Sequence, residues 1–91
     1  MKPAELQDVA EVCKMLSDST RLSIVAILSK GAQPVNALRR ELKLAQPITS
    51  HHLGLLRMSG LVDRKRKGKS QIYSLKREAL EPARAFLAKV K

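Results

Sequence analysis

The sequence contains one cysteine, no tryptophan and only two aromatic residues, Tyr73 and Phe86, among its 91 residues. A single thiol, that of Cys13, excludes an internal disulfide framework and predicts a protein of the reducing cytoplasm. No apolar run approaches the roughly 20 residues that cross a bilayer, which argues against a transmembrane helix. The first residues also lack the apolar core of a signal peptide, so we expect no secretion.

Acidic residues are scarce. Eight Asp and Glu stand against 18 Lys and Arg, which gives a formal net charge of +10. Such an excess in a short chain indicates a polyanionic partner, most often a nucleic acid, although charge alone also allows an anionic membrane surface. Hydrophobic residues make up 44% of the chain, enough for one small core. A domain this small buries a modest fraction of its surface, so dimerisation would help to stabilise it.

Two helices are predicted in the first third of the chain. Residues 3–16 carry one apolar stripe at three- and four-residue spacing, formed by Leu6, Val9, Val12, Cys13 and Leu16. Residues 20–29 are apolar over much of the helical circumference, which is typical of a helix at the centre of a core. Between the two, Asp18 or Ser19 can cap the second helix.

A helix-turn-helix is predicted next. Residues 35–42 favour a short third helix, and residues 43–45 a turn into a fourth helix that begins at residue 46 and ends near residue 59. This fourth helix has one side that can be buried, formed by Thr49, His52, Leu53, Leu55 and Leu56. Its other side is small and polar, formed by Gln46, Pro47, Ser50, His51, Gly54 and Arg57. Such a polar face suits a helix that enters the major groove of DNA.

A basic β-hairpin follows. Residues 61–66 and 70–75 favour two strands, and residues 67–69 their connection, with Gly68 available for a positive φ angle. Five of the six residues from 64 to 69 are basic. These charges could belong to a merely solvated hairpin. However, like charges at this density repel one another, and neutralisation by phosphates would offset that cost, so we expect contact with a DNA backbone.

The last helix is predicted at residues 76–91 and carries a second apolar stripe. Leu80, Ala83, Leu87 and Val90 recur at spacings of three, four and three. Pro82 lies inside this pattern, so the helix either begins there or bends there. The stripe exceeds what a small core needs. We therefore expect the first and last helices to pair two subunits across a two-fold axis.

Four segments together resemble the ArsR/SmtB family of small bacterial winged-helix repressors: residues 16–22, 46–57, 59–62 and 66–75. The Ser50-His51-His52-Leu53 block, with the wing that follows it, is fairly specific to that family. The resemblance implies a mainly α fold with a small β-hairpin, a winged helix-turn-helix of order helix-helix-helix-helix-strand-strand-helix. The length of 91 residues predicts a single domain over residues 1–91. The resemblance covers roughly residues 10–76, and it implies a homodimer formed by the first and last helices, here residues 3–16 and 77–90. Such a protein is a repressor of palindromic operators.

The resemblance and the residue pattern together give the expected site residues. The groove positions are Gln46, Pro47, Ser50 and His51. The DNA surface is extended by Arg57 and by the wing residues Arg64, Lys65, Arg66, Lys67, Lys69 and Gln71. The expected subunit interface consists of Leu6, Val9, Cys13, Leu80, Ala83, Leu87 and Val90. A smaller or polar residue is common in the family at position 48 and an aliphatic one at position 49, whereas this chain has Ile48 and Thr49.

The metal-sensing sites of the family do not carry over. Many relatives hold a metal through a cysteine pair in the third helix, where this chain has Asn36-Ala37-Leu38. Others use Asp and His pairs on the last helix, where this chain has Glu78 and Glu81. Adjacent His51 and His52 point about 100° apart on a helix and cannot chelate one ion. We therefore expect no metal and no cofactor.

The two histidines are expected to have different roles. His51 is predicted to be a groove contact and His52 a half-buried, hydrogen-bonded residue.

Several alternatives stay open at this point. Cys13 lies on an apolar stripe, which favours a buried inert thiol over a redox sensor. No nucleophile, base and phosphate-binding loop form a catalytic constellation, so we expect no enzyme. The main hypothesis is a dimeric, sequence-specific repressor without a membrane partner, and the alternative is a nonspecific architectural DNA-binding protein. The inducer could be a small molecule, a protein partner or oxidation of Cys13, or there could be none.

Overall fold

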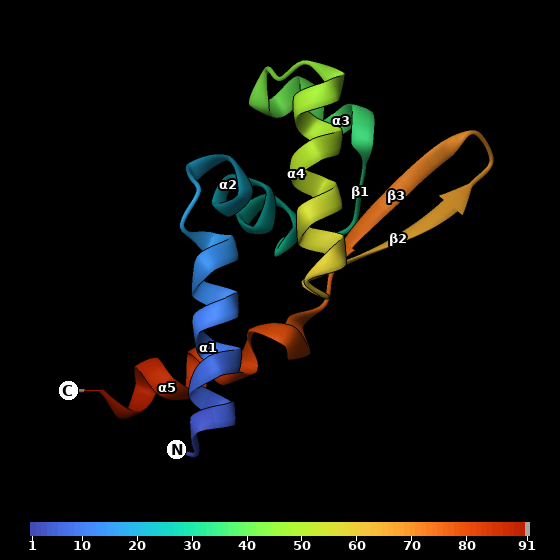
Figure 1. Cartoon of the computed structure of the whole chain (residues 1–91). Helices are drawn as coiled ribbons and strands as arrows, with labels where there is room; N and C mark the ends of the chain where they lie inside the picture. The colour runs from blue at the N-terminus through green and yellow to red at the C-terminus, as the bar shows by residue number, and fades with distance from the viewer. Residues whose placement is uncertain (91) are drawn as a thin grey trace.

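The computed structural model describes residues 1–90, so Lys91, the last residue of the predicted domain, lies outside the described part. The described residues form five α-helices, a short 3₁₀ helix and three strands, and Figure 1 shows their arrangement. In order they are α1 (Pro3–Leu16), α2 (Ser19–Leu28), β1 (Gln33–Pro34), α3 (Val35–Leu42), α4 (Gln46–Met58), β2 (Val62–Lys67), β3 (Ser70–Leu75), η1 (Arg77–Leu80) and α5 (Glu81–Lys89). The predicted winged helix-turn-helix is confirmed.

The sheet has one strand more than the predicted hairpin. β1 pairs with β3, in antiparallel register Gln33↔Tyr73 and Pro34↔Ile72, and the strand order is β1-β3-β2. A strand of two residues is too short to show an alternating pattern in the sequence, and a proline in it is tolerated because the strand lies at the sheet edge. β1 ties the start of α3 to the base of the wing.

The last helix begins later than predicted. Residues 77–80 form the 3₁₀ turn η1, and α5 starts at Glu81 with Pro82 in its first turn. Proline lacks a backbone N–H, and the first turn of a helix is where that donor has no partner in any case. Pro82 therefore marks a helix start and not a bend. Val90 lies just beyond the end of α5 and has an extended backbone.

The core lies where α2 meets the helix-turn-helix and the base of the sheet. α2 contributes the fully buried Ile24 and the buried Leu28, which confirms the predicted central position of this helix. Fully buried leucines of α3 and α4 pack against it, and Val62 and Tyr73 bring in the sheet. Each fully buried aliphatic side chain contributes about 1.5–3 kcal/mol relative to exposure, so this cluster fixes how α3 and α4 sit on α2.

The fold separates two surfaces. α1 and α5 cross at one end of the molecule, and the hairpin of β2 and β3 extends away from the body on the side of α4 (Figure 1). α4 stands between these two regions. Within residues 1–90, no helix is long and apolar enough to cross a membrane.

Candidate nucleic-acid interface

α4 has one buried side and one exposed side, as predicted. Thr49, Leu53 and Leu56 are fully buried against the rest of the chain. The four predicted groove positions, Gln46, Pro47, Ser50 and His51, are all exposed. Leu55, which the pattern placed on the buried side, is only half-buried. The four predicted groove positions are therefore available to a partner.

The ends of α4 are defined by its backbone bonds. Ala45 occupies the N-cap position and offers no side-chain acceptor. The Oγ1 of Thr49 donates a hydrogen bond of 3.0 Å to the carbonyl oxygen of Ala45, which also accepts from the Thr49 N–H, so this bond satisfies none of the free N–H groups of the first turn. At the other end, Gly60 has a φ of 83° and its N–H donates to the Arg57 carbonyl, while the N–H of Leu61 donates to Leu56. This is the Schellman arrangement, which favours glycine at its left-handed position.

A polar cluster attaches α4 to the junction of α1 and α2. The Nη1 of Arg21 lies 3.4 Å from Nδ1 of His52, and the Nε of Arg21 donates to the Met15 carbonyl at 2.8 Å. The Oδ2 of Asp18 accepts from the Arg21 N–H at 3.0 Å and lies 3.8 Å from the same His52 nitrogen. The half-buried, hydrogen-bonded state predicted for His52 is therefore confirmed. This cluster restricts rotation of α4 about its own axis.

The cluster favours the charged form of the Asp18 carboxyl group. The hydrogen bond from the Arg21 backbone N–H lowers the pKa of Asp18 below its ordinary value, and the nearby His52 and the Arg21 charge lower it further. Partial burial opposes this shift. Asp18 is also the N-cap of α2, a position that sequence analysis assigned to Asp18 or Ser19.

Arg39 of α3 is a residue that the sequence pattern did not single out. Its Nη1 lies 3.3 Å from Oδ1 of Asn36 and 3.5 Å from Oε1 of Gln46, so it connects the two helices of the helix-turn-helix beside a groove position. Its Nε is buried without a hydrogen-bond partner. Only a contact between helices reveals this role, because Arg39 and Gln46 are seven residues apart with a turn between them. That turn contains Lys43, whose φ is 55°.

The wing is strongly basic and well separated from the body. β2 pairs with β3 in the register Val62↔Leu75 to Lys67↔Ser70, and Gly68 takes a φ of 63° in the two-residue turn. Lys67, predicted to lie in the connection, is the last residue of β2. After its first residue β2 is exposed throughout, which places Arg64, Lys65, Arg66 and Lys67 in solvent, with Lys69 in the turn also exposed. Gln71 is half-buried on β3.

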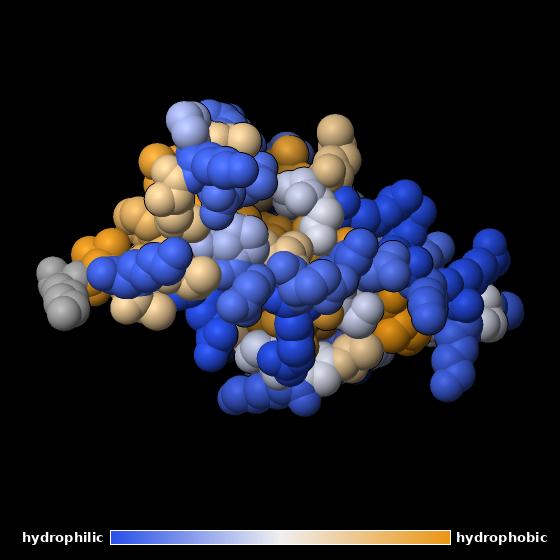
Figure 2. Space-filling model, turned by 90° about the horizontal axis from the view of Figure 1, so that it is seen from below, coloured by the Kyte–Doolittle hydropathy of each residue, from blue (hydrophilic) through white to orange (hydrophobic). Residues whose placement is uncertain are grey.

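The two ends of the molecule differ in polarity. Figure 2 shows hydrophilic residues over the wing, at the right-hand end, and more hydrophobic surface toward the opposite end, where α1 and α5 lie. At that opposite end, Leu6 is 44% exposed, Leu87 66% and Val90 56%. Leu6 lies on α1 and Leu87 on α5, and Val90 lies just beyond the end of α5. Exposed apolar side chains of this size are candidates for contact with another protein.

Some residues expected at the subunit interface are instead buried by contacts within the single chain. Val9 and Ala83 are buried between α1 and α5 of the same chain, and Leu80 is half-buried there. Val9 and Ala83 lie on the apolar stripes as predicted, but contact between α1 and α5 of the same chain already buries them. Cys13, predicted to be a buried thiol, is exposed in the single chain. It lies on the outer side of the α1 stripe, away from the core.

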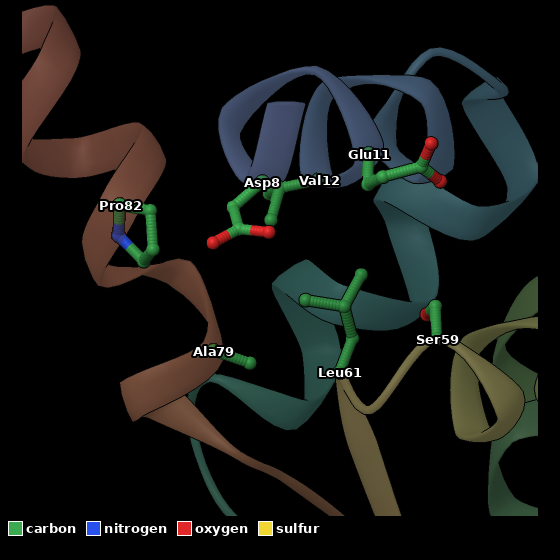
Figure 3. Close-up of a pocket in the computed structure, with 7 residues that line it drawn as sticks. All are labelled: Asp8, Glu11, Val12, Ser59, Leu61, Ala79 and Pro82. Carbon is green, nitrogen blue, oxygen red and sulfur yellow. The ribbon is translucent and has the colours of Figure 1, made fainter. Parts of the chain in front are cut away.

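A cavity of about 370 Å³ lies between these helices and the end of α4. α1 contributes Asp8, Glu11 and Val12 to its lining, and the segment between α4 and β2 contributes Ser59 and Leu61. Figure 3 shows the Asp8 carboxylate extending toward the space between α1 and α5, with Leu61 between the helices. The cavity therefore connects the α1–α5 region to the C-terminal end of α4. In the described residues, no three His, Cys, Asp or Glu side chains converge as metal ligands would.

Comparison with known proteins assigns the family. Residues 18–64, which contain α2 and the helix-turn-helix, match the family model described as bacterial regulatory protein, arsR family. The biofilm growth-associated repressor of Xylella fastidiosa is 38% identical over 68 residues, which are 75% of this chain and 60% of that protein. The chain thus spans less than two thirds of that relative. A cadmium resistance regulatory protein homologue, CadC, of Staphylococcus aureus is 37% identical over 83 residues, which are 88% of this chain and 69% of that protein.

Solved structures agree with this assignment. The homodimeric winged helix-turn-helix DNA-binding domain of a Mycobacterium bovis protein is 33% identical to this chain and superposes with a TM-score of 0.76. The match covers 93% of this chain and 77% of that domain. It therefore includes the helices outside the residues that the family model matches. The chain belongs to the arsR family of bacterial regulatory proteins.

Proposed function

We propose that this protein is a transcriptional repressor that binds a palindromic operator as a homodimer, in the cytoplasm where promoter DNA lies. One observation carries the proposal: the exposed polar side of α4 lies beside an extended hairpin that carries five basic residues between positions 64 and 69. A helix can enter a major groove and a hairpin can follow the flanking backbone. The family assignment supports the same function.

The two parts of this surface have different tasks in the proposal. Gln46, Ser50 and His51 contact base edges, Pro47 packs beside them, and Arg57 contacts backbone at the end of the helix. A good bidentate base contact discriminates by about 1–3 kcal/mol against the wrong base. The wing residues Arg64, Lys65, Arg66, Lys67, Lys69 and Gln71 contact phosphates or the adjacent minor groove, which supplies affinity without sequence choice.

The subunits associate through α1 and α5. The exposed side chains Leu6, Leu87 and Val90, together with the exposed Cys13 of α1, form the apolar surface for a second copy. The relative from Mycobacterium bovis is homodimeric, which supports this assembly. A two-fold axis would present two α4 helices to half-sites about 34 Å apart, one turn of DNA.

A nonspecific architectural protein is the second candidate, and the net charge of +10 is the observation that favours it. Footprinting on the promoter region beside its own gene, with excess random competitor DNA, separates the two. A repressor protects one palindromic segment at a protein concentration that leaves the flanks open. Uniform protection, or protection that the competitor abolishes, would assign the architectural role.

We infer that the signal for release is not a metal ion. The chain has one cysteine, and the rings of His51 and His52 lie 5.3 Å apart at an interplanar angle of 64°, one directed at solvent and the other at Arg21. A small-molecule or protein effector would act through α1 and α5, which the cavity connects to the end of α4. Thermal shift of the DNA-free dimer with Zn²⁺, Cd²⁺ and a metabolite panel tests this. A Zn²⁺-linked shift that also releases DNA would contradict it.

A further inference from the structure

Ile48 is the third residue of α4 and is 49% exposed. The next residue, Thr49, is fully buried, with its hydroxyl bonded to the Ala45 carbonyl at 3.0 Å. The apolar side chain is thus outside and the polar one inside, which is the reverse of what core packing favours. Single exposed apolar residues are normal on protein surfaces. Ile48, however, lies in the first turn of the helix, one residue after the exposed Pro47 and three before the exposed His51.

The exposed side of α4 has two chemically different edges. Gln46, Ser50 and Arg57, at spacings of four and seven, form a polar edge on the side of α3, where Arg39 contacts Gln46. Ile48 and the half-buried Leu55, seven residues apart, form an apolar edge on the opposite side. His51 lies next to that apolar edge. The helix therefore presents hydrogen-bonding groups along one side and aliphatic carbon along the other.

Base pairs offer one apolar group in the major groove, the 5-methyl group of thymine. The N-terminal residues of a recognition helix are those that contact base edges. An isoleucine placed against the amino group of adenine or cytosine would remove water from a donor without replacing its hydrogen bond. Against a thymine methyl group, the same side chain buries apolar surface on both partners. Its β-branch also holds χ1 in few rotamers, so its position is well defined.

We propose that Ile48 contacts the 5-methyl group of one thymine in each operator half-site and thereby determines the base at that position. This inference rests on the proposed function, because it requires α4 to lie in the major groove. Ile48 would act next to His51 and on the opposite edge of α4 from Ser50, and it would add a preference for A·T pairs that neither polar side chain provides.

Replacing thymine by deoxyuridine tests the contact, because it removes the methyl group and nothing else. The operator is first selected from a random duplex library with the wild-type dimer. Each thymine is then replaced singly, and Kd is measured at one fixed salt concentration. One thymine per half-site should show an affinity loss of about fourfold, as expected for one buried methyl group at ~0.8 kcal/mol. For the Ile48→Ala variant, the same replacement should change Kd by less than about 1.5-fold.

Leu22→Ala is the matched control, because Leu22 is an exposed aliphatic residue of α2 with 50% exposure. It should retain the full loss at the sensitive thymine. Ile48→Val, which shortens the side chain by one carbon, should give an intermediate loss, and circular dichroism confirms the fold of each variant. An Ile48→Ala variant that keeps the wild-type sensitivity at every thymine would overturn the proposal. If Ser50→Ala still loses specific binding in that case, the groove position of α4 stands and only the role of Ile48 fails.

Discussion

Arg21 and His52 join the start of α2 to the middle of α4: the Nη1 of Arg21 lies 3.4 Å from Nδ1 of His52, although 31 residues separate them. The same guanidinium donates from Nε to the Met15 carbonyl at the end of α1. The Arg21 side chain therefore links α2 to both α1 and α4. The contact adds a polar link to the buried side of α4, where Thr49, Leu53 and Leu56 pack.

Replacing Arg21 by alanine should destabilise the protein by about 1–3 kcal/mol, because the Met15 carbonyl and His52 both lose a partly buried partner. Urea unfolding monitored by circular dichroism measures this change. Arg84→Ala is the control, since Arg84 makes only an exposed pair with Glu81 at 3.3 Å. Its effect should stay within about 0.5 kcal/mol. Equal effects of the two variants would mean that the Arg21 cluster does not support the fold.

The lowered pKa of Asp18 gives stability a defined dependence on pH. A carboxyl group with a depressed folded-state pKa stabilises the protein above its unfolded-state value of about 3.9 and loses that contribution as pH falls through the folded value. Asp18→Ser keeps a capping oxygen for α2 but removes the charge. We expect wild type to exceed this variant in unfolding free energy at about pH 5, with the difference shrinking as the pH falls below about 4. A difference that is independent of pH would show that the charge plays no part.

Lys43 adopts a left-handed backbone, with a φ of 55°, in the turn between α3 and α4. That conformation costs roughly 1–2 kcal/mol for a residue with a Cβ atom, whereas glycine adopts it readily but loses more chain entropy on folding. Lys43→Gly should therefore raise the unfolding free energy by about 0.5–1 kcal/mol. Lys43→Ala, which removes the charge but keeps the Cβ atom, should bring no such gain. Stabilisation by alanine to the same extent would assign the effect to charge.

The exposed apolar end of the molecule predicts how the subunits can be separated. Leu87→Lys places a charge on a side chain that is 66% exposed on α5 and should shift the protein toward monomers in sedimentation equilibrium. Met58→Lys, at an apolar residue that is 88% exposed on α4, is the control and should leave the dimer intact. If Leu87→Lys stays dimeric while Met58→Lys dissociates, the subunit interface lies at α4 and not at α5.

Periodicity predicted the first four helices well, but it placed the start of the last helix at residue 76, whereas α5 begins at Glu81. α1 was predicted from Pro3 to Leu16 and α3 from Val35 to Leu42, and both bounds are confirmed. β1 was missed, since two residues contain no period. The burial of Val9 and Ala83 inside the chain was also missed, because a stripe shows that a side chain is covered but not which chain covers it. The contacts of Arg21 and Arg39 with α4 depend on packing that the sequence does not display.

The central claim is that α4 selects the DNA sequence while the wing supplies affinity. The most direct test is the ratio of Kd on random DNA to Kd on the selected operator, measured for Ser50→Ala on α4 and Lys67→Ala on the wing. Ser50→Ala should lower this ratio by the equivalent of about 1–3 kcal/mol. Lys67→Ala should weaken both complexes alike and reduce the slope of log K against log salt by about 0.9 per lost phosphate contact. If Ser50→Ala weakens both DNAs equally, or if Lys67→Ala changes the ratio, α4 is not the element that selects the sequence.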